Sequence, residues 1–556
     1  MQNLLDNLVT LLHKDERLVS EGDLLKNKVI ELAIKLDKNL INLLLSDPKI
    51  KDTFFIETGA ATIFDKDKFI KFVSNKQFLP DSYTAFKNKI GLTEDDEFIS
   101  EKKEVVLSWP YKDCVLEGGM TREDQKRDEI FWNQTLAPDE VSRLLDPKVF
   151  TNAKRIDKDG EHKLDGFRTD EKGDIKDNLI IKGNNLLALH SLKKRFAGKV
   201  KLIYIDPPYN TGGAEDTFKY NDSFNHSTWL VFMKNRLEIA KDLLSKDGAI
   251  YVQLDYNEVH YCKVLMDEIF GRENFQREII WRIGWVFGFK TADKNWIRNH
   301  DTILFYSKDK NSLEFYKKYI PYPKDYVRRD GSKPEGEGYP YEDTWNCSDL
   351  DQLHSIAIVS FTKEKVGDFK GQKNEALIKR IIDAHTKEGD IVLDFFSGTG
   401  TTASVAHKLK RQWITVEQID EQIDKQLRRL NKVLKGDQTG ISKSVGWKGG
   451  GDFVYLELME WNENLVNRIQ SAESKEDLQE LWTIMKDKAF LSYKVDIKAF
   501  DSHAKDFSDL SMEDQKRFLI ESLDQNHLYV NYSEIDDEEY SISDEDKNLN
   551  KEFYKS

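Results

Sequence analysis

The sequence is poor in cysteine and has no long apolar run. Its three cysteines, Cys114, Cys262 and Cys347, lie far apart, which excludes a disulfide framework and a cysteine-based metal site. No apolar stretch approaches the ~18 residues that a membrane-spanning helix needs. The N-terminal segment MQNLLDNLVTLLHKDERL mixes acids with bases and has no small-residue cleavage site, which indicates a helix rather than a signal peptide. These absences predict a cytoplasmic protein with no membrane partner and no bound metal.

Positive charge is also scarce overall, since the formal net charge is -15 at pH 7. This balance argues against a nucleic-acid partner, but phosphate binding needs only a local basic surface. Much of the acid lies in the tail at 534–546, EIDDEEYSISDED. In residues 277–333 the balance reverses, and aromatic residues such as Trp281 and Tyr326 are interleaved with the Lys and Arg. This mixture suits phosphate gripping and base stacking, although a solvated face beside an ordinary core explains it equally well.

Alternating strand and helix patterns predict an α/β fold in the middle of the chain. Buried strands are expected at 178–183, 200–206 and 248–255, each followed by a helix. After the basic segment, helix, strand, helix and strand patterns resume over 375–418. The alternation implies a parallel sheet covered on both faces and built from two stretches of chain.

The chain divides by composition into six regions. Residues 151–177 are charged and punctuated by glycine, which is typical of a linker or an exposed hairpin. The expected regions are a helical N-terminal region (1–105), a connector (106–177), the first part of the α/β domain (178–276), a basic insertion (277–365), the second part of the α/β domain (366–450) and an acidic C-terminal region (451–556).

A glycine-rich loop follows one of the expected strands, in the sequence DIVLDFFSGTGTT. Gly398 and Gly400 come directly after the strand, where glycine permits a tight turn and a close approach of the backbone to a ligand. Asp394 ends this strand and can bind the ammonium group of a cofactor. The next strand ends in Glu417, where a carboxylate can accept two ribose hydroxyls. A P-loop would need Gly-Lys-Ser/Thr here, whereas Ala403 satisfies the dinucleotide fingerprint, so the loop alone leaves a dehydrogenase open.

The strongest chemical signal is the run Asp206-Pro207-Pro208-Tyr209-Asn210 at the end of the strand VKLIYID. The prolines have no backbone N–H and fix φ, so they hold their carbonyls in a rigid loop at the strand end where α/β sheets bind ligands. An acid, a fixed carbonyl and an aromatic ring suit a flipped-out adenine. Asp206 and the Pro207 carbonyl can accept the two N6 hydrogens, and Tyr209 can stack on the purine.

The chemistry of an adenine amino group explains why these residue types are needed. The N6 lone pair is delocalised into the ring and is poorly nucleophilic. Acceptors for both hydrogens favour a pyramidal nitrogen whose lone pair points at an incoming methyl group, and proton loss follows transfer. Neither a metal nor a covalent intermediate is required. The alternative is a simple turn after a buried strand.

These motifs resemble those of the β-class DNA amino-methyltransferases. Asp206-Pro207-Pro208-Tyr209 resembles motif IV, and Phe396-x-Gly398-x-Gly400 resembles motif I. Motif IV precedes motif I, and a basic insertion separates them, as in the permuted β-class order. The resemblance implies a Rossmann-like sheet in permuted order, S-adenosyl-L-methionine (SAM) as cofactor and adenine N6 as the methyl acceptor.

The resemblance extends to residues near the cofactor and the target base. Gly183-Asn184-Asn185 resembles the segment near the SAM adenine, where an Asp is commoner, and Gln372-Lys373-Asn374-Glu375 resembles motif X, where the family has Lys-Pro. Asn299-His300-Asp301 resembles the motif beside the target-base pocket. The motifs together assign catalysis to Asp206, Pro207, Pro208 and Tyr209, target-base contact to Asn210 and His300, and cofactor binding to Asn184, Asn185, Lys373, Asn374, Asp394, Phe396, Gly398, Gly400, Thr401 and Glu417.

A wider resemblance, over about residues 100–460, is to the modification subunits of type III restriction-modification systems. It is carried by segments such as WPYKDCVLEGGMTREDQKR, FKYNDSFNHSTWLVFMKNRL and GWKGGGDFVYLEL. Such subunits act as dimers on double-stranded DNA and bind an ATP-dependent restriction (Res) subunit, so the resemblance implies these three partners. The chain has no Gly-x-x-x-x-Gly-Lys-Thr and no nuclease motif, so any cleavage belongs to a partner.

Several alternatives stay open on the sequence. Within the same chemistry they are an orphan or type II adenine enzyme and a cytosine-N4 enzyme, which more often resembles Ser-Pro-Pro-Tyr. From other classes they are an RNA or protein methyltransferase, a dehydrogenase and a catalytically silent DNA-binding scaffold. The insertion at 277–365 is expected to contact DNA, with Lys and Arg mostly positioning phosphates. The acidic C-terminal region is expected to contact the Res subunit or a second copy.

Overall fold

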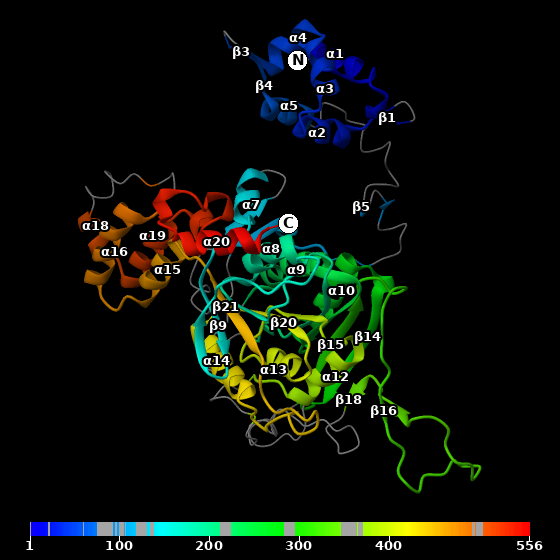
Figure 1. The fold of residues 1–556 in the computed structure, drawn as a ribbon. Helices are drawn as coiled ribbons and strands as arrows, with labels where there is room; N and C mark the ends of the chain where they lie inside the picture. The colour runs from blue at the N-terminus through cyan, green and yellow to red at the C-terminus, as the bar shows by residue number, and fades with distance from the viewer. Residues whose placement is uncertain are drawn as a thin grey trace. The chain divides into compact units, whose positions relative to one another are not determined.

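The computed structural model divides the chain into two compact units, Met1–Val105 and Val106–Ser556. Over the ranges that it describes, no helix is both long and apolar enough to cross a membrane. The structure describes residues 2–20, 23–58, 61–74, 93–94, 97–98, 105, 107–117, 130–133, 138–211, 224–282, 295–345, 364, 371–491, 495 and 504–555 (Figure 1).

The first unit is built mainly from short helices, as the amphipathic patterns predict. Side chains cap two of these helices: Asp37 accepts a hydrogen bond from the Leu40 backbone at the start of α3 (Lys38–Leu45), and Asp47 caps α4 (Pro48–Phe54) ahead of Pro48. A single apolar core, which includes Leu12, holds the unit together. Its elements are α1 (Gln2–Leu12), β1 (Val19–Ser20), β2 (Asp23–Leu24), α2 (Lys26–Ile34), α3 (Lys38–Leu45), α4 (Pro48–Phe54), β3 (Phe55–Thr58), β4 (Ala61–Phe64), α5 (Lys66–Ser74), β5 (Thr93–Glu94) and β6 (Glu97–Phe98).

The second unit is organised around one 11-stranded sheet. In spatial order its strands are β10 (Gly160–Lys163), β9 (Phe150–Asp157), β21 (Asp452–Leu458), β11 (Leu179–Lys182), β20 (Gln412–Glu417), β19 (Ile391–Asp394), β12 (Val200–Ile205), β13 (Leu244–Leu254), β15 (His300–Ser307), β14 (Phe275–Arg282) and β18 (Thr344–Trp345). The six strands from β21 to β13 are parallel to one another, β9 is antiparallel to β21, and β15 is antiparallel to both β13 and β14.

Helices cover both faces of this sheet, as Figure 1 shows. Successive residues of β12 point into different cores: Ile203 and Ile205 pack in one apolar cluster and Tyr204 in the other. One face is covered by α8 (Asn185–Phe196), α9 (His226–Leu243) and α10 (Val259–Phe270), and the other by α12 (Glu375–His385), α13 (Thr401–Lys408) and α14 (Asp420–Leu434). The predicted α/β fold, with β12 preceding β19 in sequence but adjacent to it in space, is confirmed.

The sheet is wider than the sequence patterns indicated. Residues 151–177 were expected to form a linker or an exposed hairpin; β9 and β10 do form a hairpin, but β9 also pairs with β21, so the hairpin extends the main sheet and β10 is its edge strand. Residues 277–282 and 300–307, expected within the insertion, belong to β14 and β15 of the sheet. The charged side chains of Arg277 and Glu278 are exposed, which explains why composition alone resembled an insertion.

The C-terminal region packs back onto the second unit. Asn550 on α20 donates to the Phe150 carbonyl and accepts from its N–H, both at 2.7 Å, and the ring of Phe553 lies 4.7 Å from that of Phe150. Acidic residues of the tail pair with the body, as in Lys163–Glu545 at 2.6 Å. The remaining elements are β7 (Cys114–Glu117), β8 (Ile130–Asn133), α7 (Pro138–Leu144), β16 (Tyr319–Ile320), β17 (Tyr339–Pro340), α15 (Asn462–Ser471), α16 (Lys475–Lys488), α18 (Ala504–Asp509), α19 (Met512–Glu521) and α20 (Asp544–Phe553).

Candidate active site

The Asp-Pro-Pro-Tyr run lies at the carboxyl end of β12, in the middle of the sheet. Every residue of β12 is buried, and the neighbouring strands β19 and β13 run parallel to it. The indole N–H of Trp229 on α9 donates to the Pro208 carbonyl at 2.9 Å, which fixes the loop to the helix layer. Asp206 therefore begins a rigid loop at the edge where parallel sheets bind ligands.

The Asp206 carboxylate has two protein partners. Its Oδ1 accepts a hydrogen bond of 2.8 Å from the Tyr209 hydroxyl, and its Oδ2 forms an ion pair with Nζ of Lys373. Burial raises the pKa of Asp206, and the Lys373 ammonium opposes that rise. The side chain is still 22% exposed, so the carboxylate can be reached from outside.

Tyr209 is held by two acids. Its hydroxyl lies 2.8 Å from Asp206 and 3.2 Å from Oδ2 of Asp301 on β15. Burial and the Asp206 carboxylate raise the pKa of Tyr209 well above its usual range, so the phenol stays neutral and remains a donor. The two hydrogen bonds fix the position of the ring.

Asn210 shapes the turn that follows Tyr209. It adopts a left-handed backbone with φ of 59°. Its side-chain Nδ2 donates to the buried Glu258 at 2.6 Å, while its Oδ1 accepts from the Phe224 backbone at 2.7 Å. His226 contacts the same Glu258 oxygen at 2.7 Å. The predicted contact of Asn210 with a target base stays a prediction, since both ends of its amide have protein partners.

His300 and Asp301 lie at the start of β15 and face opposite ways. The His300 side chain is exposed, whereas Asp301 is buried and accepts from Tyr209, Gln253 and Arg298. Sequence reasoning singled out the histidine, and its contact with a base stays a prediction. The alternation of side chains along a strand was the available signal that Asp301, next in sequence, faces the other way.

The glycine loop after β19 is shaped by Asp394 and Glu417. Asp394 accepts from the Phe396 backbone at 3.0 Å and from the Thr402 hydroxyl at 2.6 Å. Gly398 donates its backbone N–H to Glu417 at 2.8 Å, and its φ is 48°. A Cβ on Gly400, whose φ is 74°, would lie 2.5 Å from the Gln426 side chain. Both backbones therefore favour glycine, and at Gly400 the contact with Gln426 disfavours any larger residue as well.

Two acids in this loop have different surroundings. Burial raises the pKa of Asp394 to about 7, and the carboxylates of Asp206 and Glu417 add to the rise. Glu417 instead accepts backbone N–H groups from Gln418 and Ile419, both at 3.0 Å. These hydrogen bonds hold the Glu417 carboxylate in one orientation beside Gly398.

The segment 183–185 lies against the same loop. Gly183 donates its N–H to the Glu417 carbonyl at 2.9 Å, and Asn184 caps α8. Asn185 is fully buried; it donates to the Phe395 carbonyl at 2.7 Å and accepts from Arg236 at 2.6 Å. The structure thus brings the predicted cofactor residues of α8, β19 and β20 together.

The motif X segment lies on the other side of the loop. Asn374 caps α12 by accepting from the Ala376 backbone at 2.7 Å, and the Thr401 hydroxyl lies 3.4 Å from the Lys373 carbonyl. Thr401 also accepts from Arg429 at 2.6 Å. The segment is therefore attached directly to the glycine loop.

A buried charge network that sequence reasoning missed supports this junction. Glu375 pairs with Lys408 at 2.7 Å, and both side chains are almost fully buried. Arg429 lies 3.9 Å from Glu364, whose pKa is raised to about 7 by burial and by the Glu375 carboxylate. Because α12 and α14 contain several other charged residues, no local pattern distinguished the members of this network.

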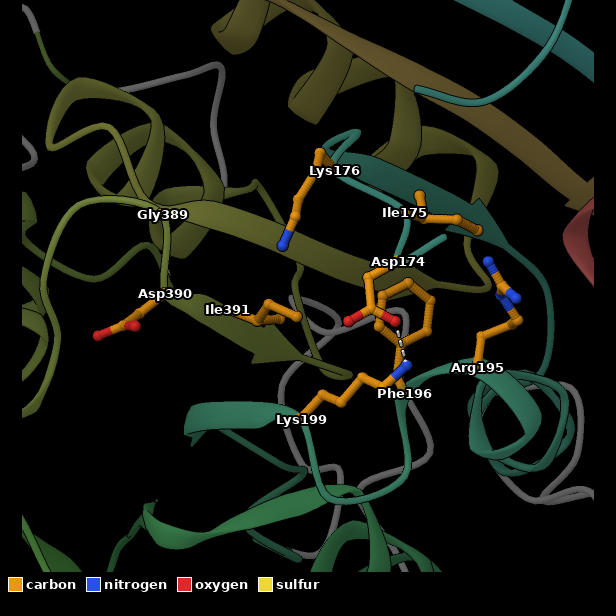
Figure 2. Close-up of a pocket in the computed structure, with 9 residues that line it drawn as sticks. All are labelled: Asp174, Ile175, Lys176, Arg195, Phe196, Lys199, Gly389, Asp390 and Ile391. Atoms are coloured by element: carbon orange, nitrogen blue, oxygen red, sulfur yellow. Dashed lines mark hydrogen bonds and ion pairs between the residues drawn. The ribbon is translucent and has the colours of Figure 1, made fainter. Parts of the chain in front are cut away.

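A pocket of about 280 Å³ lies at the opposite edge of the sheet, at the amino end of β19 (Figure 2). Its charged groups are engaged within the protein: Lys199 bonds Asp174 at 2.5 Å, and Lys176 pairs with Asp170 at 3.0 Å. The pocket is separate from Asp206 and the glycine loop. Its lining residues are Asp174, Ile175, Lys176, Arg195, Phe196, Lys199, Gly389, Asp390 and Ile391.

No cluster of His, Cys, Asp or Glu suited to a metal ion occurs in the described part of the chain. The arrangement is instead one of positioned acceptors beside a glycine loop. At the end of β12 the partly exposed Asp206 carboxylate lies beside Tyr209, and at the ends of β19 and β20 the acids Asp394 and Glu417 accept hydrogen bonds from the loop.

Comparison with known proteins places this geometry in context. Residues 200–428 match a DNA methylase family, and residues 37–92 match the family of type III restriction/modification enzyme methylation subunits. The Haemophilus influenzae protein named "Probable type III restriction-modification enzyme HindVI Mod subunit" is 34% identical, with 96% of each chain covered. The EcoP15I Mod subunit of Escherichia coli is 36% identical over 24% of this chain and 25% of its own. The crystal structure of the M1.HpyAVI-SAM complex aligns with 46% of this chain and 99% of its own, at 21% identity and a TM-score of 0.32.

Proposed function

The chain belongs to the Mod subunits, the methylation subunits of type III restriction-modification enzymes, and we propose that it transfers a methyl group from SAM to N6 of adenine in double-stranded DNA. One observation carries the choice of reaction. The partly exposed Asp206 directly follows β12, and the glycine loop begins at the end of the neighbouring strand β19. An acceptor for an amino group therefore lies next to a loop suited to a cofactor. Among the functions that the sequence leaves open, an amino-methyltransferase is the one that uses both the carboxylate acceptor and the cofactor loop.

The loop after β19 fits SAM as cofactor. Gly398 and Gly400 adopt left-handed backbone conformations that shape the loop, and the loop ends in Gly-Thr-Thr rather than the Gly-Lys-Ser/Thr of a phosphate site. Asp394 would hold the ammonium group and Glu417 the ribose hydroxyls, with Phe396, Gly398 and the Asn184–Asn185 segment around them. When bound, SAM supplies a methyl group activated by its positively charged sulfur.

On the acceptor side, the chain supplies position and charge. Asp206 and the Pro207 carbonyl accept the N6 hydrogens, which draws the nitrogen lone pair out of conjugation. Tyr209, fixed by Asp206 and Asp301, stacks on the purine. The rigid Pro-Pro backbone keeps both acceptors in place, and the proton that leaves N6 after transfer passes from the site through Asp206.

The contact with DNA is assigned to a projecting segment, residues 315–341, which we call the basic arm. It includes the hairpin β16–β17 and extends away from the sheet (Figure 1). The ring of Tyr322 stacks on that of Tyr326, and the ring of Tyr339 meets both edge-on; the ring centroids lie 4.8–5.5 Å apart, and these contacts stiffen the arm. Its six cations are exposed, and none makes an ion pair with any residue the structure describes; they are Lys317, Lys318, Lys324, Arg328, Arg329 and Lys333.

Free cations on a stiff arm suit a polyanion such as the DNA backbone. The base of the arm is attached to the cofactor half of the sheet, because the Tyr316 N–H donates to the Ala384 carbonyl at 2.8 Å and Arg380 lies 3.9 Å from the Tyr341 ring. DNA phosphates bound by the arm would therefore lie at a fixed position relative to the active site. Cleavage of DNA is assigned to a Res partner, and a homodimer is the assembly that we propose.

Sequencing of genomic DNA at single-molecule resolution tests the proposed reaction. Cells expressing the wild type should carry N6-methyladenine at one short asymmetric motif, on one strand. Asp206→Ala should reduce the rate of methylation at least about 100-fold, because it removes a preorganised acceptor, while leaving SAM affinity within about twofold. Asp159→Ala, at an exposed acid in the β9–β10 turn, is the matched control. A mark that persists in Asp206→Ala would reject the role of this carboxylate, and N4-methylcytosine would reject the target base.

A further inference from the structure

The partner of the catalytic carboxylate is a lysine that the motifs assigned to the cofactor. Lys373 precedes α12 and lies 167 residues from Asp206 in sequence, yet its Nζ forms an ion pair with Oδ2 of Asp206. The lysine side chain is only 9% exposed. Because a buried ammonium without a counter-charge is costly, this pairing defines where the lysine head group lies.

The surroundings of Lys373 hold it at this position. Its Nζ also donates to the Gly371 carbonyl at 3.3 Å, and its own carbonyl accepts from the Thr401 hydroxyl at 3.4 Å. The ammonium lies 5.5 Å from the centre of the Tyr209 ring. Lys373 thus contacts the glycine loop through Thr401 and lies beside the side chains of Asp206 and Tyr209.

Charge argues against a direct contact of Lys373 with the methyl donor. The reactive part of SAM is a sulfonium cation, and a second cation beside it would be repelled. Paired with Asp206, the ammonium is neutralised. The lysine therefore acts on the carboxylate rather than on the cofactor.

We propose that Lys373 is a positioning residue for methyl transfer, whose ammonium keeps the Asp206 carboxylate ionised and oriented toward the amino group of the target base. This inference rests on the proposed function, because it assumes that Asp206 accepts a hydrogen from N6. It reassigns Lys373 from cofactor binding to the chemistry on the acceptor side.

Several other groups bear on the charge of Asp206. Tyr209, in the same loop, donates a hydrogen bond to the Asp206 carboxylate. Asp301 on β15 and Asp394 on β19 are acids whose negative charge disfavours ionisation of Asp206. Tyr204 on β12 is neutral and buried. Lys373 is the cation in direct contact with Asp206 among the described residues. Without Lys373, burial and the two acids would raise the pKa of Asp206 further than in the wild type, so the carboxyl would be protonated at a higher pH.

Steady-state methylation of duplex DNA by the full chain, measured across pH, tests the proposal. Lys373→Met should lower kcat about 100-fold near neutral pH and shift the acid limb of kcat/KM upward by about one to three pH units. SAM affinity, measured by calorimetry, should stay within about twofold, which also shows that the variant is folded. Lys373→Arg should restore most of kcat and the wild-type acid limb, because it restores the positive charge.

A neighbouring lysine provides the control. Lys379→Met removes a lysine that pairs with Asp383 on α12 and should leave both kcat and the pH profile unchanged. If Lys373→Met instead weakens SAM binding in parallel with activity and leaves the acid limb in place, Lys373 is a cofactor residue and the inference is wrong. If the wild type transfers no methyl group to adenine in the same assay, the proposed function fails, and this result is distinguishable from a failure of the inference alone.

Discussion

Acidic residues end three adjacent strands of the sheet, and each has a different environment. Asp206 follows β12, Asp394 ends β19 and Glu417 ends β20. Asp206 is paired with a cation, Asp394 is bonded to a hydroxyl and one N–H, and Glu417 accepts three backbone N–H groups. The same residue type at the same place in the fold can therefore serve as acceptor, ammonium ligand and ribose ligand.

The raised pKa of Asp394 predicts that SAM binding depends on pH. With a pKa of about 7, Asp394 is protonated in the free protein below that pH, and an ammonium ligand binds best to the ionised form. Affinity for SAM should therefore weaken as pH falls from 7.5 to 5.5, by up to about tenfold per unit below 7. Calorimetric titrations across this range measure the effect. Asp394→Asn should give weaker binding with a flat profile, and an unchanged slope in that variant would assign the titration to another group.

At the scale of elements, helix α20 and the basic arm differ in how they are attached to the α/β sheet. The acidic C-terminal region was expected to contact a partner, but part of it supports β9, where Asn550 satisfies both backbone groups of Phe150. Over the described residues, the basic arm contacts the rest of the unit at its base, and its cations make no ion pair there. Helix α20 thus stabilises the fold, whereas the cations of the basic arm remain available to bind a ligand.

The arm should contribute to DNA affinity through phosphates. Replacing Arg328 and Arg329 together by Ala should weaken DNA binding at every sequence and reduce the slope of log Kd against log salt by about 1.8, which is about 0.9 for each phosphate that is no longer neutralised. Fluorescence anisotropy at several salt concentrations measures this slope. The matched control replaces Lys158 and Lys163, two exposed lysines of the β9–β10 hairpin at the other end of the sheet. Equal losses in the two double variants would show a general charge effect rather than a binding arm.

The whole molecule contains separate apolar cores. Among the described residues, the apolar core of Met1–Val105 consists of side chains between residues 4 and 73, whereas the sheet of the second unit has apolar cores on its two faces. All the residues assigned to SAM and to Asp206 chemistry lie in the second unit. Stability and cofactor binding of that unit therefore need not depend on the first.

Deleting residues 1–105 should accordingly leave SAM affinity within about twofold and the unfolding temperature of the α/β unit unchanged. Calorimetric titration and thermal unfolding followed by circular dichroism measure both quantities. Deleting 544–556 is the contrasting case, because it removes the fully buried Phe553 and should destabilise the unit by at least about 3 kcal/mol. Loss of SAM binding on removal of 1–105 would show that the two units form one folding unit.

Much of the fold and part of the site follow from local sequence. The strands β12, β19 and β20 are apolar runs that end in an acid or a glycine turn, so their positions and the residues at their ends were predictable. The outer strands were not, because β9 and β14 carry charged residues on partly or fully exposed faces and resemble connectors. Pairing of β9 with β21, far away in sequence, gives no local signal.

By itself the sequence determined the α/β class, the permuted order of the motifs and the residues that end the central strands, since each depends on a short stretch of chain. Only the tertiary structure decided which side chains meet Asp206. Asp301 reaches Tyr209 across 92 residues and Lys373 reaches Asp206 across 167, because β15 and the start of α12 converge on the same edge of the sheet. Partners of a buried charge are set by where distant elements pack, and that information is not contained in any local pattern.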